Sequence, residues 1–106
     1  MQKFHTIKIG GEEYKLRLTV NSIEDVEKKL GKSLYMALEE IQYNMVSTLA
    51  AILWGSLQKF NDNITYEKAV DLFDQYIDDG HSMQDMMEEL NVVFDVSGFF
   101  VKGQAN

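Results

Sequence analysis

Residues 4–20 read FHTIKIGGEEYKLRLTV and decide the fold class. Apolar and polar residues alternate on both sides of a glycine pair, and the apolar set is Ile7, Ile9, Tyr14, Leu16 and Leu18. A period of two is typical of strands with one buried face. Gly10 and Gly11 permit the positive φ angles that tight hairpin turns require. The stretch therefore predicts an antiparallel β-hairpin whose opposite face, with Lys8, Lys15 and Arg17, is solvated.

Beyond the hairpin the apolar spacing changes from two to three and four, which is typical of helices. Residues 20–31, VNSIEDVEKKLG, predict a short helix that is capped by Asn21 or Ser22 and ends at Gly31. A second short helix is predicted over residues 34–42.

Residues 41–58 contain no charged side chain, which raises the question of a membrane span. A spanning helix needs about 20 mostly apolar residues, and this run includes Gln, Asn, Ser and Thr. We therefore predict that residues 45–60 form the buried central helix of a helical layer.

Two amphipathic helices are predicted in the rest of the chain. The first covers residues 66–79 behind the N-cap Thr65, and the second begins after Ser82, with Asp85 completing a capping box. The sequence thus predicts a single α+β domain over residues 1–106, with an N-terminal antiparallel β-hairpin packed on roughly four or five helices. A short polar tail is expected from about residue 101.

The charge is unevenly distributed along the chain. Residues 1–32 hold seven Lys and Arg against five Asp and Glu, a sum of +2, whereas residues 33–106 hold three against twelve, a sum of −9. Nucleic-acid binding depends on clustered Lys and Arg, so no nucleic-acid partner is expected. The acidic part favours a basic or apolar protein partner, although acidity also serves solubility alone.

The residue types for catalysis and cofactor binding are sparse. The chain has no cysteine, and its two histidines, His5 and His81, are not spaced as metal ligands. IDDGHSMQD at residues 77–85 lacks the ligand pattern of a calcium loop, and GKS at 31–33 lacks the earlier glycine of a phosphate loop. We expect no catalytic residue, no cofactor and no metal, and hence no enzyme.

Three features remain as candidates for partner binding. The methionines of SMQDMMEEL form a soft apolar surface, although methionine at helical spacing is more often core filling. Two aspartates stand at the end of a predicted helix, where the helix dipole disfavours them. In SGFF, residues 97–100, we expect Phe99 to fold back on the last helical turn and Phe100 to be exposed. The candidate partner-binding residues are Met83, Met86, Met87, Phe100, Asp78 and Asp79.

Four segments in order carry a family resemblance: IKIGGEEYKLRLTVNSIEDVEKKLGKSL, LWGSLQKF, YEKAVDLFDQYIDDG and VVFDVSGFF. Together they resemble the tail assembly chaperones of long-tailed phages and prophages of Gram-positive bacteria, over nearly the whole chain. The resemblance implies a protein without enzymatic activity that binds the tape measure protein, and possibly the tail tube protein, and keeps the tape measure soluble during tail tube assembly.

The same resemblance implies that the protein acts in the cytoplasm of the bacterial host and is absent from the mature virion. The lack of an apolar leader in MQKFHTIKIG and the lack of cysteine agree with a cytoplasmic location. An alternative also fits the charge: a small acidic regulator or DNA mimic that binds a basic protein. Either function needs a binding surface and no membrane.

Overall fold

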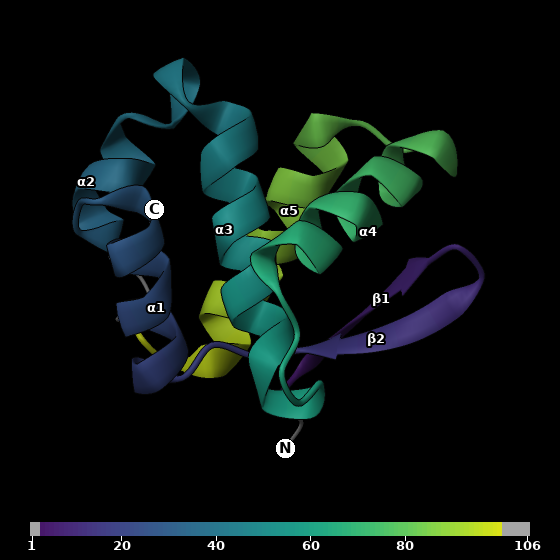
Figure 1. Ribbon diagram of the computed structural model, residues 1–106, viewed down its shortest axis with the longest axis horizontal. Helices are drawn as coiled ribbons and strands as arrows, with labels where there is room; N and C mark the ends of the chain where they lie inside the picture. The colour runs from purple at the N-terminus through teal and green to yellow at the C-terminus, as the bar shows by residue number, and fades with distance from the viewer. Residues whose placement is uncertain (1–2, 101–106) are drawn as a thin grey trace.

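The computed structural model describes residues 3–100 and has the expected α+β architecture (Figure 1). Within these residues a two-stranded sheet is followed by five α-helices and two short 3-10 turns. The elements are β1 (His5–Ile9), β2 (Glu12–Leu16), α1 (Val20–Leu30), α2 (Leu34–Glu39), η1 (Ile41–Tyr43), α3 (Met45–Leu57), η2 (Gln58–Phe60), α4 (Tyr66–Asp78) and α5 (Met83–Ser97). The polar tail expected from about residue 101 lies outside the described residues.

The hairpin forms as the alternating pattern predicts. β1 and β2 pair antiparallel, and Ile7 lies opposite Tyr14. Gly10 and Gly11 have φ angles of 60° and 82°, so both turn positions occupy the left-handed region that glycine tolerates best. The apolar face is buried, and Ile7 and Leu16 are at most 2% exposed. One face of the hairpin therefore belongs to the core.

The start of α1 differs from the prediction. Thr19, not Asn21 or Ser22, is the N-cap. The Ser22 N–H donates to the Thr19 hydroxyl at 3.1 Å, while the Thr19 N–H donates to the Ser22 hydroxyl at 2.8 Å. This reciprocal pair satisfies two helix-terminal donors, and the helix therefore begins at Val20. The predicted caps of α4 and α5, Thr65 and Ser82, are confirmed.

Helix α3 is the centre of the molecule, as its uncharged sequence indicated. It packs against α1, α4, α5 and β2 (Figure 1). Nine of its 13 residues are buried, and Ala51, Leu53 and Leu57 are fully enclosed. The α-helix ends at Leu57, and the rest of the predicted span is the 3-10 turn η2. No helix within residues 3–100 has the length and apolar character that crossing a membrane requires.

Helices α1 and α3 approach each other closely at Gly55. A β-carbon placed on Gly55 would lie 2.5 Å from Cγ2 of Val26 and 3.4 Å from the carbonyl oxygen of Ser22. Real β-carbons do not approach another carbon this closely, so only glycine fits this crossing without movement. The close crossing brings the α1 side of the core against α3 and leaves the opposite side of α3 for α4 and α5.

Candidate functional site

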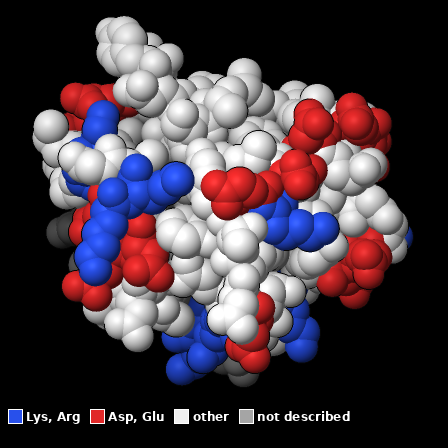
Figure 2. All heavy atoms as spheres, in the orientation of Figure 1, with Lys and Arg blue, Asp and Glu red and all other residues white. Residues whose placement is uncertain are grey.

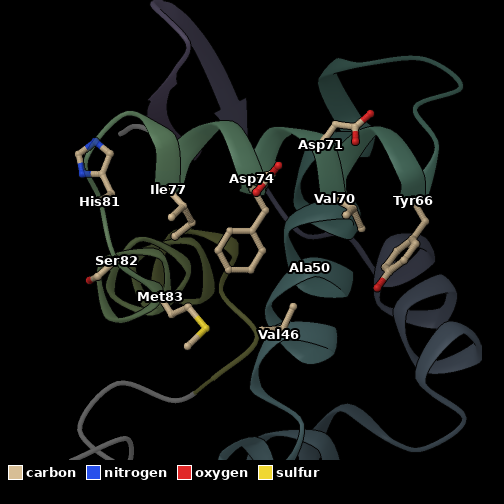
Figure 3. Close-up of a pocket in the computed structure, with 11 residues that line it drawn as sticks. Val46, Ala50, Tyr66, Val70, Asp71, Asp74, Ile77, His81, Ser82 and Met83 are labelled. Atoms are coloured by element: carbon tan, nitrogen blue, oxygen red, sulfur yellow. The ribbon is translucent and has the colours of Figure 1, made fainter.

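An open apolar groove lies beneath α4, between the N-terminal half of α3 and the start of α5 (Figure 3). We call it the α3–α4–α5 groove; its volume is about 570 Å³. Ala50 and Phe73 are buried at its floor. Its walls are large apolar side chains that are each more than one third exposed: Val46, Val70, Ile77 and Met83. Exposed apolar surface that is gathered in one hollow is typical of a binding site.

The close-up shows how the three helices contribute to the groove. Val46 on α3 and Met83 on α5 lie on opposite sides, and Val70 and Ile77 reach down from α4 (Figure 3). The ring of Tyr66 stands at one end and His81 at the other (Figure 3). The groove therefore runs along most of the length of α4.

Helix α4 carries two parallel stripes beside the groove. Positions 66, 70, 73 and 77 share one helical face and are apolar, whereas positions 67, 71, 74 and 78 share the adjacent face and are acidic. All four acidic residues are exposed. Asp71 and Asp74 line the rim, with their carboxylates directed away from the floor (Figure 3). A ligand in the groove would thus meet apolar side chains below and negative charge along one edge.

The distribution of charge on this side of the molecule agrees with that description. Figure 2 shows an uncharged area over α3 and the upper part of the molecule, with acidic side chains along α4. Basic and acidic side chains are mixed on the side of α1. On this face, the acidic side chains along α4 border the uncharged area, and other acidic and basic side chains lie elsewhere.

A second, smaller hollow lies on the other side of the N-terminal half of α3. Its volume is about 260 Å³, and it is bounded by α2, η1, α3 and α5. Its lining is mostly apolar: Leu38, Ile41, Leu49, Ile52, Met87, Leu90, Asn91 and Phe94. Most of these side chains belong to the core cluster or pack against it, so we take the hollow as an incompletely filled part of the core.

The three candidate methionines have three different environments. Met83 is 40% exposed and lines the α3–α4–α5 groove. Met87 is partly buried and lines the second hollow. Met86 is fully buried in the core, which corrects its inclusion among the partner-binding residues. Met86 shares one face of α5 with Leu90 and Val93, which are also buried, since residues three to four apart share one face.

The two candidate aspartates also have different environments. Asp78 is exposed, whereas Asp79 accepts a hydrogen bond from the Gly10 N–H at 2.6 Å and another from the Gln75 side chain at 2.9 Å. The bond from the Gly10 amide, and next that from Gln75, lower the pKa of Asp79. Asp79 thus fastens the hairpin turn to the end of α4. Its presence at a helix end has a structural explanation that the sequence did not reveal.

Phe100 is exposed as predicted, but the prediction of which phenylalanine folds back on the last helical turn is wrong. Phe100, not Phe99, packs edge-on against Phe94, with 5.2 Å between ring centroids. Gly98 ends α5 with a φ of 79°, and its N–H bonds to the carbonyl oxygens of Phe94 and Asp95. After this ending the second phenylalanine, and not the first, returns to the last turn. Both rings are still about 40% exposed, at 39% for Phe99 and 41% for Phe100.

A small network of titratable groups joins β1, α4 and α5. Glu89 lies 2.6 Å from the His5 ring nitrogen Nε2 and accepts a bond from the Tyr76 hydroxyl at 3.4 Å. Burial, and next the charge of Glu89, raise the pKa of Tyr76 to about 12, so this hydroxyl stays protonated near neutrality. His81 stacks on the Tyr76 ring with 4.2 Å between centroids. These contacts connect elements of the fold.

Within residues 3–100, no group of three or more His, Cys, Asp or Glu side chains is arranged to hold a metal ion. The two histidines belong to different parts of the structure. His5 contacts Glu89 beside the hairpin, and His81 lies at the end of the groove. The arrangement supports binding of an apolar segment more directly than any covalent chemistry.

Most of the groove was missed from the sequence. Val46, Tyr66, Val70 and Ile77 line it, and none of them was among the predicted partner-binding residues. The spacing of the acidic positions beside the apolar ones on α4 was the available signal, because two parallel stripes on one helix indicate a border between apolar and charged surface. The partners of that helix across the groove required the tertiary structure.

The comparisons with known proteins gave one family match. No curated protein and no solved structure matched the chain. Residues 1–106, the whole sequence, match a family described only as a family of unknown function, DUF6096. The chain therefore belongs to the DUF6096 family.

Proposed function

We propose that this protein is a tail assembly chaperone of a long-tailed phage or prophage, which binds the tape measure protein and keeps it soluble until the tail tube has formed. The order of sequence segments described above suggests this class. The structural observation that carries the proposal is the α3–α4–α5 groove, where four large apolar side chains remain exposed together on a fold that already has a continuous core.

A groove of this kind suits a client whose apolar stripes would otherwise aggregate. In helix-in-groove recognition, an amphipathic helix places its apolar face into a hydrophobic hollow. The tape measure protein of such phages is expected to be long and helical, and so to present many apolar stripes before the tube covers them. Covering one stripe at a time in the groove would keep the client soluble while leaving the complex reversible.

The remaining parts of the proposal follow from the same assignment. The chaperone would act in the host cytoplasm, would contact the tail tube protein at most transiently, and would leave before the virion is complete. A DNA mimic is less well supported, because mimicry needs a continuous acidic surface. On the face in Figure 2 the acidic side chains form separate groups around uncharged surface.

Co-expression tests the proposal directly. The reading frames near this gene should include one very long helical protein, which is the candidate tape measure. Co-expression with the chaperone should raise the soluble yield of that protein and lead to its co-purification, because its apolar stripes would be covered. Unchanged solubility without co-purification would refute the assignment. If the protein instead displaces DNA from a DNA-binding protein, the mimic function is correct.

A matched pair of variants locates the client on the surface. Val70 lines the groove and Val92 lies on α5 outside it, and their exposed fractions are nearly equal at 39% and 40%. Val70→Glu should abolish the gain in client solubility, since it places a charge in the apolar contact. Val92→Glu should keep it. Equal behaviour of the two variants would move the client site away from the groove.

A further inference from the structure

We propose that the α3–α4–α5 groove accepts an amphipathic α-helix of about three turns that carries Lys or Arg along the flank beside α4. This inference rests on the proposed function only for the natural source of the helix, which would be the tape measure protein. The charge, secondary structure and length of the bound segment are inferred from the residues that line and border the groove.

The acidic edge of the groove indicates the charge of the ligand. Glu67, Asp71, Asp74 and Asp78 lie three or four residues apart, so neighbouring carboxylates share one edge of α4 and repel each other. Asp78 is also in the last turn of the helix, where the helix dipole disfavours a negative charge. Only Glu67, in the first turn, is favoured by the helix dipole, so folding gains nothing evident from the other three.

These four carboxylates have no cationic partner inside the described chain. The ion pairs among residues 3–100 join His5 to Glu89, Lys32 to Glu40 and His81 to Asp85. None of them involves the acidic edge of α4. A ligand with basic side chains on the matching flank would supply the missing positive charge, and it would do so next to the apolar contact that holds it.

The backbone around the groove indicates that the ligand is a helix. The three surrounding walls are α-helices, and beyond their first turns their backbone N–H and C=O groups bond within each helix. An extended peptide in the groove would leave its own backbone groups without partners, whereas a helix satisfies them internally. The groove also lies away from the only described sheet, β1–β2, so it offers no strand edge to pair with.

The length of the groove sets the length of the bound segment. Its lining extends along α4 from Tyr66 to Ile77, a rise of about 16 Å at 1.5 Å per residue. A ligand helix of about three turns spans the same distance and presents apolar side chains at positions i, i+4, i+7 and i+11. This spacing repeats the pattern of the apolar stripe on α4, so the two helices can interdigitate side by side.

Synthetic peptides test the inference without any phage protein. Two labelled helical peptides of about 18 residues, long enough to form helix in isolation, share the same apolar positions and differ only in having Lys or Glu on one flank. Fluorescence anisotropy should show the Lys peptide binding about tenfold or more tightly than the Glu peptide at low salt, with the difference shrinking as salt is added. A scrambled Lys peptide with the same composition serves as the control for nonspecific attraction.

Variants of the protein separate the contribution of the apolar groove from that of the acidic edge of α4. Val70→Glu should eliminate binding of the Lys peptide. The double variant Asp71→Asn, Asp74→Asn should weaken it about fivefold, and Glu24→Gln, Asp95→Asn, which removes the same charge from two other exposed positions, should change it less than twofold.

The possible results separate this inference from the chaperone assignment. Equal affinity for the Lys and Glu peptides, binding of the scrambled peptide as tightly as the ordered one, or failure of both peptides to bind would each refute the inference. Capture of the tape measure protein together with such a result would leave the chaperone assignment intact and show that another surface holds the client. Binding of the Lys peptide in the groove without any tape measure capture would support the inference and refute the chaperone assignment.

Discussion

Replacing Gly55 with alanine should destabilise the protein, although alanine is the better helix former. In an exposed helix position the change from glycine to alanine is worth about 1 kcal/mol in favour of folding. At Gly55 the added β-carbon would lie 2.5 Å from Cγ2 of Val26, nearly 1 Å closer than ordinary contact distances. The packing cost at the α1–α3 crossing therefore opposes the gain in helix propensity.

The surroundings of Gly55 indicate which effect is larger. Overpacking a core costs about 1–3 kcal/mol, and the upper end applies here because Val26 is 1% exposed and its branched side chain has few alternative rotamers. Subtracting the gain in helix propensity from the packing cost leaves a net decrease of about 2 kcal/mol in the free energy of unfolding. For a domain of this size the melting temperature should fall by about 10 °C.

Urea unfolding followed by circular dichroism measures the loss, and two comparisons isolate its cause. Ser47→Ala against Ser47→Gly, at an exposed position of the same helix, gives the propensity term for α3. Val26→Ala removes the atom that alanine would meet, so the double variant with Gly55→Ala should lose at least about 1 kcal/mol less than the sum of the single changes. If Gly55→Ala is as stable as the wild type, or if the two changes are additive, the close crossing does not limit α1–α3 packing.

Substitutions at three further contacts test the structure. Phe100→Ala should cost about 0.5–1.5 kcal/mol in urea unfolding and Phe99→Ala clearly less, because only the former ring packs edge-on against the last turn. Tyr76 has its pKa raised from 10.0 to about 12, so the unfolded chain loses this proton first and stability falls as pH rises between those values; Tyr76→Phe should flatten that fall. Asp79 has a lowered pKa, so its contribution is present above pH 3.8 and is lost as pH falls through the lowered pKa. Asp79→Ala should remove that dependence and speed hydrogen exchange of the turn amide, as NMR would show.

The hairpin and the helices could be predicted because their signals are local. Two glycines between alternating residues specify the turn, and Ser82 with Asp85 specifies the start of α5. The start of α1 was predicted wrongly because serine and threonine both serve as N-caps, and the pairing of Thr19 with Ser22 decides between them. Local patterns thus place a helix well and its first residue less well.

Contacts between distant segments could not be predicted in the same way. The bond from Gly10 to Asp79 joins residues 69 positions apart, and the bond from the Leu18 N–H to Ser97 joins residues 79 positions apart. Neither pair has a sequence signal, since each needs only one donor and one acceptor placed by the fold. The burial of Met86 beside the exposed Met83 depends likewise on which side of α5 meets α3.

The division of α4 into faces explains why binding and stability should be separable in this protein. Ala69, Leu72 and Tyr76 form its buried face, with exposed fractions of 0%, 6% and 1%. Val70 and Ile77 lie toward the groove and remain more than one third exposed, so charged substitutions there remove little core packing. A variant at Val70 that loses peptide binding while keeping its unfolding midpoint would therefore report on the groove. A variant at Leu72 should lose peptide binding and stability together. Any binding surface on α4 depends on the packing of the buried face of this helix against α3.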